Sequence, residues 1–384
     1  MLSKNWLKWK HGSMRYSPAV KTRLSPPDLT VKRLAAVAQV DPSELMRYAG
    51  NTAVMYRSAR KQWDGKKHRV IRPMNKKFKK MSKRLHKFFQ RQPWWHGAAH
   101  GSICHRSCFT SAARHVGQRH VFTRDVENCF PSITTDALYR QLLLLRFKPD
   151  VADLLAKLMT CDGTIPQGCP TSTDAVNLFF AGLDQRLAST AAAMGAQYSR
   201  VVDDVVVSAK DKDAGQIVIN RVEHEFERLG LKTNLKKKQT DGYRGPHQKR
   251  HVHGLDISSK RGVQISRQCK EKALAVAQSY LDSCKSATPL SLESIAAKRE
   301  RAMGYMQHLR QGTGSTFRQL DQKVKAGDRA VQAKLRRVGV TCRKNRWWII
   351  RGPQDRITKA ARNIVREVAR QWHATKYSTP SSSP

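Results

Sequence analysis

Residues 199–208 read SRVVDDVVVS, and this stretch decides how the rest of the chain is interpreted. Two valines precede the pair Asp203-Asp204 and three follow it. Valine favours extended backbone, so the stretch predicts a β-hairpin that is buried on one or both faces. An isolated Asp-Asp dipeptide more often marks a solvated turn, which is the alternative interpretation. Two adjacent carboxylates in apolar surroundings repel each other and need a cation.

A third carboxylate, Asp125, lies 78 residues upstream, near the end of the predicted strand HVFTRDVENCF. Carboxylates that meet at strand ends can hold two divalent cations about 3.5–4 Å apart. Mg²⁺ prefers a few carboxylates plus substrate phosphates, with Mn²⁺ as the alternative metal. The three aspartates therefore predict nucleotidyl transfer, in which one ion activates a 3′-hydroxyl and the other steadies the leaving pyrophosphate. A solvated strand-end carboxylate is the alternative for Asp125.

The charge balance indicates a polyanionic partner. The chain has 384 residues, of which 72 are Lys or Arg and 29 are Asp or Glu, a net charge of +43. Such a surface repels itself, so nucleic acid is the natural partner, and binding should depend strongly on salt. An anionic membrane competes for that role, but the sequence has neither a long basic amphipathic helix nor a run of about 18 apolar residues. We expect no membrane partner.

The opening residues, MLSKNWLKWKHGSMRY, lack the apolar core of a secretory signal, and the eight cysteines form no CxxC pair. Both features indicate a reducing cytoplasm. Cys104 and Cys108 lie near His100 and His105, so a zinc site is an alternative, although closed zinc sites usually have tighter paired spacing. We expect ordinary thiols, and structural roles for these histidines and for His115.

Periodicity and end signals predict the remaining elements. Asp41 is a candidate N-cap, with Pro42 at the first helical position and Glu44 three residues after the cap. A β-hairpin is expected in 247–266, with HVHGLDIS as one strand and a turn through Lys260-Arg261-Gly262. We expect a short strand in 65–73, helices in 29–50, 75–91, 136–147, 151–160, 175–196 and 214–230, mostly helix in 267–384, and a disordered tail, STPSSSP.

Five stretches together resemble the motifs of reverse transcriptases, in the order and spacing of that family. They are RDVENCFPSI (124–133), TIPQGCPTSTDAVNL (164–178), SRVVDDVVVS (199–208), LGLKTNLKKKQT (229–240) and HVHGLDIS (251–258). The resemblance covers residues from about 66 to about 270 and is weaker through the thumb.

The retron-type bacterial enzymes are the most similar subgroup. SAARH (111–115) stands where they carry Asn-Ala-x-x-His, and PQGCPTST and RAMGYMQHLRQ (301–311) also resemble them. The chain departs from their pattern with Val201-Val202 for Tyr-Ala, His253 for the Thr of Val-Thr-Gly, Ser111 for Asn and Thr173 for Pro. These departures bear on whether the product is a branched RNA–DNA molecule. They leave the polymerase assignment intact.

The resemblance implies an α+β right-hand polymerase with fingers, a helical thumb, and a palm of ferredoxin-like antiparallel sheet plus helices. On this basis we expect an N-terminal helical extension at 1–60, fingers at 61–120, a palm at 121–265 with a fingers insertion at about 136–170, a thumb at 266–325 and a basic C-terminal extension at 326–384.

The resemblance also assigns roles to residues at the reacting centre. Asp125, Asp203 and Asp204 would be catalytic and hold two Mg²⁺ ions, with the carbonyl of Val126 completing one coordination shell. Phe130 would lie under the nucleotide sugar and exclude a 2′-hydroxyl, with an ordinary core Phe as the alternative.

Further residues would bind the nucleotide. Gln167 and Gly168 would pack along it, unless they form a plain turn. Lys237 would donate a proton to pyrophosphate, although its neighbours Lys236 and Lys238 compete for that role. The fingers candidates for the triphosphate are Lys66, Lys67, Arg69 and Arg72, with a solvated run of charge as the alternative.

The C-terminal segment CRKNRWWIIRG is a candidate nucleic-acid contact. Its aromatic pair would stack on unpaired bases beside basic side chains, unless both tryptophans belong to the core of a small β element. The residues concerned are Arg343, Lys344, Arg346, Trp347 and Trp348.

The sequence thus predicts an RNA-directed DNA polymerase of retron type. Its expected partners are a structured non-coding RNA that serves as template and primer, the RNA–DNA hybrid, deoxynucleoside triphosphates and an effector protein, with a role in antiviral defence. Two rivals stay open, namely an RNA-binding scaffold with an inactive palm and a mobile-element or untemplated DNA polymerase of the same fold.

Overall fold

The computed structural model describes residues 25–63, 68–259, 262–286, 292–310, 315–337, 340–343 and 346–349. These residues fall into two compact units that divide between Val263 and Gln264. Each unit is described by itself below.

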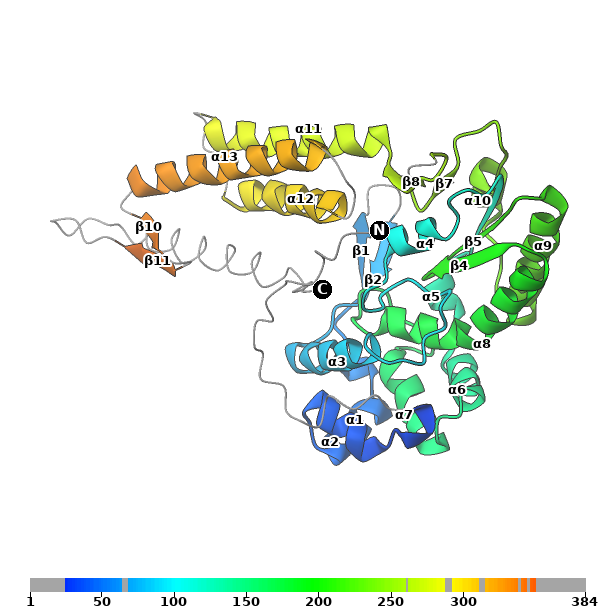
Figure 1. Ribbon diagram of the computed structural model, residues 1–384. Coiled ribbons are helices and arrows are strands. Elements are labelled where there is room, and N and C mark those ends of the chain that lie inside the picture. Colours follow the sequence, from blue (N-terminus) through cyan, green and yellow to red (C-terminus); the bar gives the residue numbers. More distant parts are fainter. Residues whose placement is uncertain are drawn as a thin grey trace, which may run out of the picture. The chain divides into compact units, whose positions relative to one another are not determined.

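The first unit is built on a four-stranded antiparallel sheet with the order β4-β5-β3-β6. Strands β4 (Gln197–Val201) and β5 (Asp204–Ala209) form the hairpin predicted around the aspartate pair, and β3 (His120–Asp125) ends at the predicted carboxylate (Figure 1). The short edge strand β6 (Tyr243–Arg244) has no counterpart among the predictions.

Strand β5 is buried on both faces, as its run of valines predicts. Side chains alternate between the faces of a strand, and Val205, Val207 and Ala209 all belong to the main hydrophobic core. Val206 and Ser208 are also buried but point to the opposite face, the face shared by Asp204.

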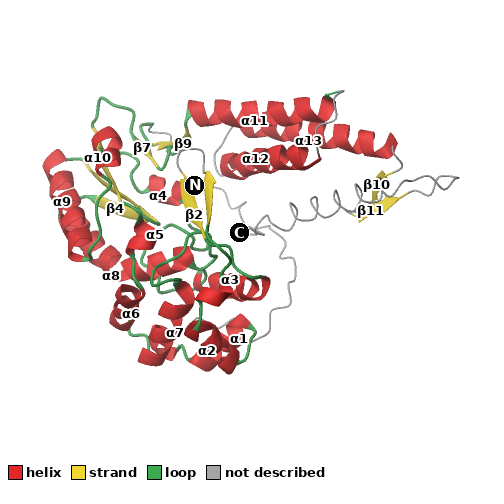
Figure 2. Ribbon diagram, turned by 180° about the vertical axis from the view of Figure 1, so that it is seen from behind, coloured by secondary structure: helices red, strands yellow, loops and turns green. Residues whose placement is uncertain are grey.

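Two long helices cover the core face of this sheet. Helix α8 (Ser172–Ala193) contacts β4, and α9 (Lys212–Arg228) contacts both β3 and β5. Figure 2 shows the strands of this sheet beside both helices. Helix α9 ends as predicted, because Gly230 adopts a φ of +73°, which closes the last turn in the left-handed region. The short helix α4 (Cys108–Ala113) contacts β4 as well.

The helices predicted in 29–50, 75–91, 136–147 and 151–160 are present, whereas the short helices Cys129–Ser132 and Leu235–Asp241 have no counterpart among the predictions. Asn75 caps α3 by accepting a hydrogen bond from the backbone N–H of Phe78 at 2.8 Å. Asp41 is the N-cap of α2 but makes no side-chain capping bond, and Glu44 accepts from the hydroxyl of Tyr48. The elements are η2 (Pro26–Asp28), α1 (Val31–Ala38), α2 (Pro42–Gly50), η3 (Ala53–Met55), β1 (Arg60–Trp63), β2 (His68–Ile71), α3 (Lys76–Phe89), α5 (Cys129–Ser132), α6 (Thr135–Leu144), α7 (Pro149–Met159) and α10 (Leu235–Asp241).

Two predicted strands differ from the structure. HVFTRDVENCF is a strand only as far as Asp125, and its last residues, Cys129 and Phe130, begin α5. HVHGLDIS is not continuous but forms two short strands, β7 (His251–Val252) and β8 (Leu255–Asp256), which pair with each other. His253 and Gly254 form the turn between them, because both have positive φ angles, 51° and 77°. Lys260 and Arg261 of the predicted turn lie outside the described residues.

The second unit is mostly helical, as expected. After β9 (Gln264–Ile265) it contains α11 (Arg267–Lys285), α12 (Leu292–Arg310) and α13 (Ser315–Arg337), which contact one another. Asp328 of α13 joins them, since it accepts hydrogen bonds from Tyr280 of α11 at 2.6 Å and Arg299 of α12 at 2.8 Å. Strands β10 (Val340–Arg343) and β11 (Arg346–Ile349) follow as a hairpin. The expected disordered tail lies outside the described residues. Within the described ranges, no helix combines the length and apolar character needed to cross a membrane.

Candidate active site

The antiparallel ladder brings the three predicted aspartates together. Asp125, the last residue of β3, pairs in register with Asp204, the first residue of β5. Asp203 occupies the turn just before β5, and its backbone carbonyl accepts a hydrogen bond from the N–H of Val126 at 3.4 Å. Residues separated by 78 positions in the sequence therefore meet at one end of the sheet.

A lysine lies between two of these carboxylates. The ammonium of Lys237 donates to Oδ1 of Asp125 at 3.0 Å and to Oδ1 of Asp204 at 3.3 Å. It reaches them from α10, whose N-cap, Asn234, also donates through its side-chain amide to Oδ2 of Asp125 at 3.2 Å. The sequence singled out Lys237 but missed Asn234, although an Asn just before a run of helix-forming residues is a recognisable N-cap signal.

The electrostatics of the carboxylates differ. Burial and then the charges of Asp125 and Asp204 raise the pKa of Asp203 to about 6. Burial also raises the pKa of Asp204, but hydrogen bonding and charge from His253 and Lys237 outweigh it and lower that pKa overall. Burial lowers the pKa of Lys237, but the two aspartates it contacts raise it further. The contact with Lys237 therefore favours the ionised form of Asp204.

The turn that carries Asp203 is strained. Val202 has a φ of 60°, in the left-handed region that β-branched residues rarely enter. Arg200 holds this conformation because its guanidinium donates to the carbonyl of Val202 at 2.6 Å. The turn also abuts Gly101, where an added Cβ would lie 2.7 Å from the backbone nitrogen of Val202. Strain maintained by surrounding contacts is typical of functional sites.

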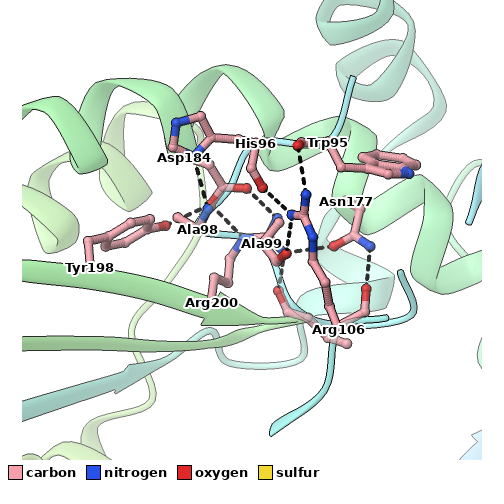
Figure 3. Close-up of polar contacts among 11 residues, drawn as sticks. Trp95, His96, Ala98, Ala99, Arg106, Asn177, Asp184, Tyr198 and Arg200 are labelled. Carbon is pink, nitrogen blue, oxygen red and sulfur yellow. Dashed lines mark hydrogen bonds and ion pairs between the residues drawn. The ribbon is translucent and has the colours of Figure 1, made fainter. Parts of the chain in front are cut away.

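Arg200 is itself fixed by a buried ion pair on the core face of the sheet. Its guanidinium donates to both carboxylate oxygens of Asp184 on α8, at 2.8 and 2.5 Å (Figure 3). Tyr198 donates to the same carboxylate at 2.8 Å, and Asn177 accepts from Arg200 at 3.1 Å. The side chains of Arg200 and Asp184 are each 1% exposed, so neither charge can rely on water.

A loop covers the free edge of β4 and completes this support. The backbone N–H of Arg200 donates to Ala98 at 2.8 Å, and the carbonyl of Arg200 accepts from His100 at 2.8 Å. Arg106 holds the loop in shape by donating to the carbonyls of His96, at 2.5 Å, and Ala99, at 2.7 Å (Figure 3). The turn with the aspartate pair is therefore supported from α8 and from this loop.

The buried pair gives a stability prediction. Asp184→Asn leaves the guanidinium of Arg200 buried without its counter-charge, which should cost about 3 kcal/mol of unfolding free energy. Urea unfolding followed by circular dichroism measures the change. Arg186→Met on the same helix is the matched control, because Arg186 is half-exposed and its partner Glu225 keeps two other arginines. That control should lose less than about 1 kcal/mol. Equal losses in both variants would contradict the assignment.

The glutamine–glycine loop predicted to line the nucleotide lies against β2. Gly168 has a φ of +92°, and an added Cβ there would meet Ile71 at 2.7 Å, so a side chain is excluded on both counts. The carbonyl of Gln167 accepts from the backbone N–H of Arg72 at 3.1 Å. The guanidinium of Arg72 forms an ion pair with Asp162 at 2.6 Å. Arg72 therefore already has a carboxylate partner in this state.

The other predicted binding residues are placed as follows. Phe130 in α5 is partly buried and packs against the core, and Arg69 lies in β2 with an exposed side chain. Lys66, Lys67 and Lys344 lie outside the described residues. Of the remaining C-terminal candidates, Arg343 lies in β10, and Arg346, Trp347 and Trp348 lie in β11.

Two of the histidines expected to be structural, His100 and His115, have hydroxyl partners. Burial lowers the pKa of His100 to about 4, and its Nδ1 lies 2.8 Å from the hydroxyl of Thr110. His115 is fully buried between Ser199 and Ser208, with each ring nitrogen 2.7 Å from a hydroxyl. Cys104 and Cys108 are partly buried thiols that form no disulfide.

The donor set at the sheet end fits divalent cations. Within the described residues no three His, Cys, Asp or Glu side chains are already arranged around a metal position. Lys237 explains the arrangement present, because its ammonium bridges Asp125 and Asp204 and supplies positive charge there. Three carboxylates and the backbone carbonyl of Val126 would supply the hard oxygen ligands that Mg²⁺ prefers.

The fold and this acidic site are matched by one protein family. Residues 60–252, just over half of the chain, match the family described as reverse transcriptase (RNA-dependent DNA polymerase), and the chain belongs to that family. The α+β right-hand polymerase fold predicted from the motifs is thereby confirmed.

Within the family, the chain is similar to retron enzymes. It is 33% identical over 152 residues to the retron Se72 reverse transcriptase of Salmonella heidelberg, a match that covers 38% of this chain and 39% of that protein. It is 30% identical over 168 residues to the retron Ec86 reverse transcriptase of Escherichia coli, which covers 43% and 50%. The chain thus spans half or less of these relatives. Among solved structures, the chain is similar to a telomerase from Candida albicans in complex with a fragment of telomeric RNA, with 10% sequence identity. That similarity covers 76% of this chain and 63% of the telomerase chain, with a TM-score of 0.39.

The shifted carboxyl gives a pH prediction for the metal-free protein. The pKa of Asp203 is about 6 in the fold against 3.8 ordinarily. The folded state therefore binds this proton more tightly than the unfolded state, so stability should fall as pH rises from about 4 to about 6. Asp203→Asn removes the effect and should raise the unfolding free energy at pH 7 by about 1–2 kcal/mol, after allowance for solvent screening.

Thermal melting in EDTA at pH 4 and pH 7 measures this difference. The variant and the parent should melt alike at pH 4 and differ at pH 7. Asp213→Asn, an exposed carboxylate on α9, is the control and should show no pH-dependent difference. A variant that melts below the parent at pH 7 would contradict the repulsion inferred here.

Proposed function

We propose that the protein is an RNA-directed DNA polymerase of retron type that adds deoxynucleotides to a 3′-end, or to an RNA 2′-hydroxyl if priming is retron-like. One observation carries the proposal, namely the register pair of Asp125 and Asp204 with Asp203 beside them, in a chain of the reverse transcriptase family. The proposed parts are fingers at 61–120, palm at 121–265 and thumb at 266–325.

Two Mg²⁺ ions, with Mn²⁺ as the alternative, would be held by Asp125, Asp203, Asp204 and the carbonyl of Val126. When bound, they would activate the attacking hydroxyl and stabilise the leaving pyrophosphate. Lys237 would give up its bridging position to them. It would remain protonated, because a lysine ordinarily carries its proton at neutral pH, and would be placed to donate a proton to pyrophosphate.

Other residues would orient the nucleotide. Phe130 follows Asp125 by five residues and, under the sugar, would exclude a 2′-hydroxyl by steric conflict. The loop with Gln167 and Gly168 would pack along the base, since it brings its backbone close to β2 without a side chain in the way. Arg72 would exchange its pair with Asp162 for the triphosphate, which an Arg can grip through two donors.

The site assignment predicts a separation of synthesis from RNA binding. Asp203→Asn and Asp125→Asn should each reduce DNA synthesis on an RNA template at least 100-fold, because each removes charge at the reacting centre, while RNA affinity stays within about twofold. Primer extension and filter binding measure the two properties. Asp213→Asn is the control and should retain synthesis. Full synthesis by Asp203→Asn would exclude the assignment.

An RNA partner is supported by the surface of α3. This helix buries Phe78, Met81, Leu85, Phe88 and Phe89 against the core, as its periodicity predicts. Its other face is exposed and almost purely basic. That face carries Lys76, Lys77, Lys79, Lys80, Lys83 and Lys87.

The lysines of this face repel one another. Lysines three and four residues apart are neighbours on a helix, and each like-charge pair costs about 0.2–0.5 kcal/mol. Among the described residues, none of these six lysines lies within ion-pair distance of a carboxylate. The phosphates of an RNA would relieve the repulsion along a helix about 20 Å long. We therefore propose that α3 binds the backbone of the RNA.

This surface predicts the salt dependence of RNA binding. Replacing Lys79, Lys80 and Lys83 with Gln should reduce the slope of log K against log salt by about 2, since each lost phosphate contact changes it by about 0.7 for single strands. Filter binding at roughly 50 to 200 mM salt measures the slope, because phosphate contacts lose affinity steeply over this range. The triple Gln variant of the exposed lysines Lys157, Lys210 and Lys212 is the control. Equal slopes in both triple variants would remove α3 from the RNA-binding surface.

Sequencing of co-purified nucleic acid separates this function from its rivals. RNA that carries attached, templated DNA supports the proposal. RNA without DNA favours a scaffold with an inactive palm, and DNA of untemplated composition favours a related polymerase. The similarity to retron enzymes is the support for a structured non-coding RNA, an effector protein and antiviral defence as parts of the proposal. The scattered cysteines without disulfide spacing support the cytoplasm as its compartment.

A further inference from the structure

His253 contacts the acidic site from the β7–β8 hairpin. The positive φ angles of His253 and Gly254 are the pattern of a type I′ turn, the tightest connection between two antiparallel strands. In this turn the Nδ1 of His253 lies 2.9 Å from Oδ2 of Asp204. The imidazole side chain is 6% exposed, so water competes little for this contact.

Both nitrogens of the ring are engaged. A carboxylate oxygen only accepts, so Nδ1 of His253 donates to Asp204. On the other side, Nε2 lies 2.9 Å from the hydroxyl of Ser111 in α4. Ser111 therefore holds the ring from the side opposite Asp204. The ring cannot turn without losing both bonds.

The bond from Ser111 continues through the outer face of the sheet. Its hydroxyl lies 2.7 Å from that of Ser199 in β4, and Ser199 lies 2.7 Å from Nε2 of His115. Nδ1 of His115 lies 2.7 Å from the hydroxyl of Ser208 in β5. Burial lowers the pKa of His115 to about 3, so this ring is neutral. Hydrogen bonds therefore connect His253 to Ser208 through Ser111, Ser199 and His115.

This arrangement divides the two oxygens of Asp204 between two partners. Oδ1 faces Lys237 at 3.3 Å, and through it Asp125, whereas Oδ2 is held by His253. The carboxylate is therefore fixed in rotation, with one oxygen directed to the place where positive charge is needed. Partners that orient a ligand in this way typically change metal affinity 10–100-fold when they are removed.

We propose that His253 is a positioning residue that orients Asp204 for metal binding, and that Ser111 fixes the His253 ring in that orientation. The inference rests on the proposed function, because it takes Asp204 as a ligand of a divalent cation. It adds two residues at which this chain departs from the retron pattern and gives them a joint role. His253 touches neither substrate nor metal in this role, so it is not a catalytic residue.

Four variants of the full chain test the proposal. His253→Phe removes both bonds but keeps a ring. His253→Asn keeps a donor near the position of Nδ1 and suits the left-handed backbone of the turn. Ser111→Ala removes only the support of the ring and leaves the turn untouched. His251→Phe, two residues away in the same hairpin, is the matched control.

The primary readout is the affinity for Mn²⁺ without substrate, measured from the electron paramagnetic resonance of the free ion. His253→Phe should raise the dissociation constant about tenfold. Ser111→Ala should raise it about threefold, less than the 10–100-fold typical of a partner that contacts the ligand itself, because Ser111 acts only through His253. His253→Asn and His251→Phe should stay close to the parent. Primer extension should show the same order in the Mg²⁺ concentration for half-maximal rate, with the KM for deoxynucleotides unchanged.

Thermal melting of each variant shows whether it folds, and Ser111→Ala supplies the test if His253→Phe does not. A folded His253→Phe with the Mn²⁺ affinity of the parent would overturn the inference, as would Asn and Phe variants that are impaired equally. If the parent makes DNA but the affinities do not change, the inference alone fails. If the affinities change as expected but the parent makes no DNA, the proposed function fails and the positioning role stands.

Discussion

The repulsion among three carboxylates at one end of an apolar sheet is the constraint on which the rest of this structure depends. Asp125 and Asp204 face each other across neighbouring strands, and Asp203 lies next to them in a turn. Burial, and then the charges of Asp125 and Asp204, raise the pKa of Asp203 to about 6. Such a cluster persists only where cations and rigid surroundings hold it, and the structure supplies both.

Side chains on both faces of the sheet hold the turn that carries the aspartate pair. On the core face, the buried pair of Arg200 and Asp184 fixes the strained backbone at Val202. On the outer face, the imidazole of His253 holds the second oxygen of Asp204. Arg200 contacts the backbone carbonyl of Val202, whereas His253 contacts the side chain of Asp204. Positioning within fractions of an ångström is what two-metal chemistry requires of its ligands.

Part of this arrangement could be predicted from the sequence, because it follows from local pattern. The valines flanking Asp203 predict the hairpin, and the amphipathic spacing of Phe78, Met81 and Leu85 predicts α3. The motif order also indicates that Asp125 would meet the aspartate pair. The valine pattern and the helical spacing are local signals, and the order of the motifs along the chain links them into one fold.

The remainder depends on tertiary contacts that no periodicity encodes. HVHGLDIS alternates like one strand, but His253 and Gly254 turn it back on itself, which moves an apparent strand residue into contact with Asp204. Ser111 and His253 look like two unrelated departures from a motif until their contact is seen. No pattern in the sequence of α8 marks Asp184 as buried, because buried residues occur on every side of this helix.

The most direct test of the central claim is the position of bound Mn²⁺, found from anomalous scattering of crystals grown with the ion. The account predicts Mn²⁺ coordinated by oxygens of Asp125, Asp203 and Asp204, at about 2.1–2.2 Å as for similar hard cations, with the ammonium of Lys237 displaced from its bridge. Crystals with saturating Mn²⁺ in which Lys237 still bridges Asp125 and Asp204, and the ion lies elsewhere, would contradict it.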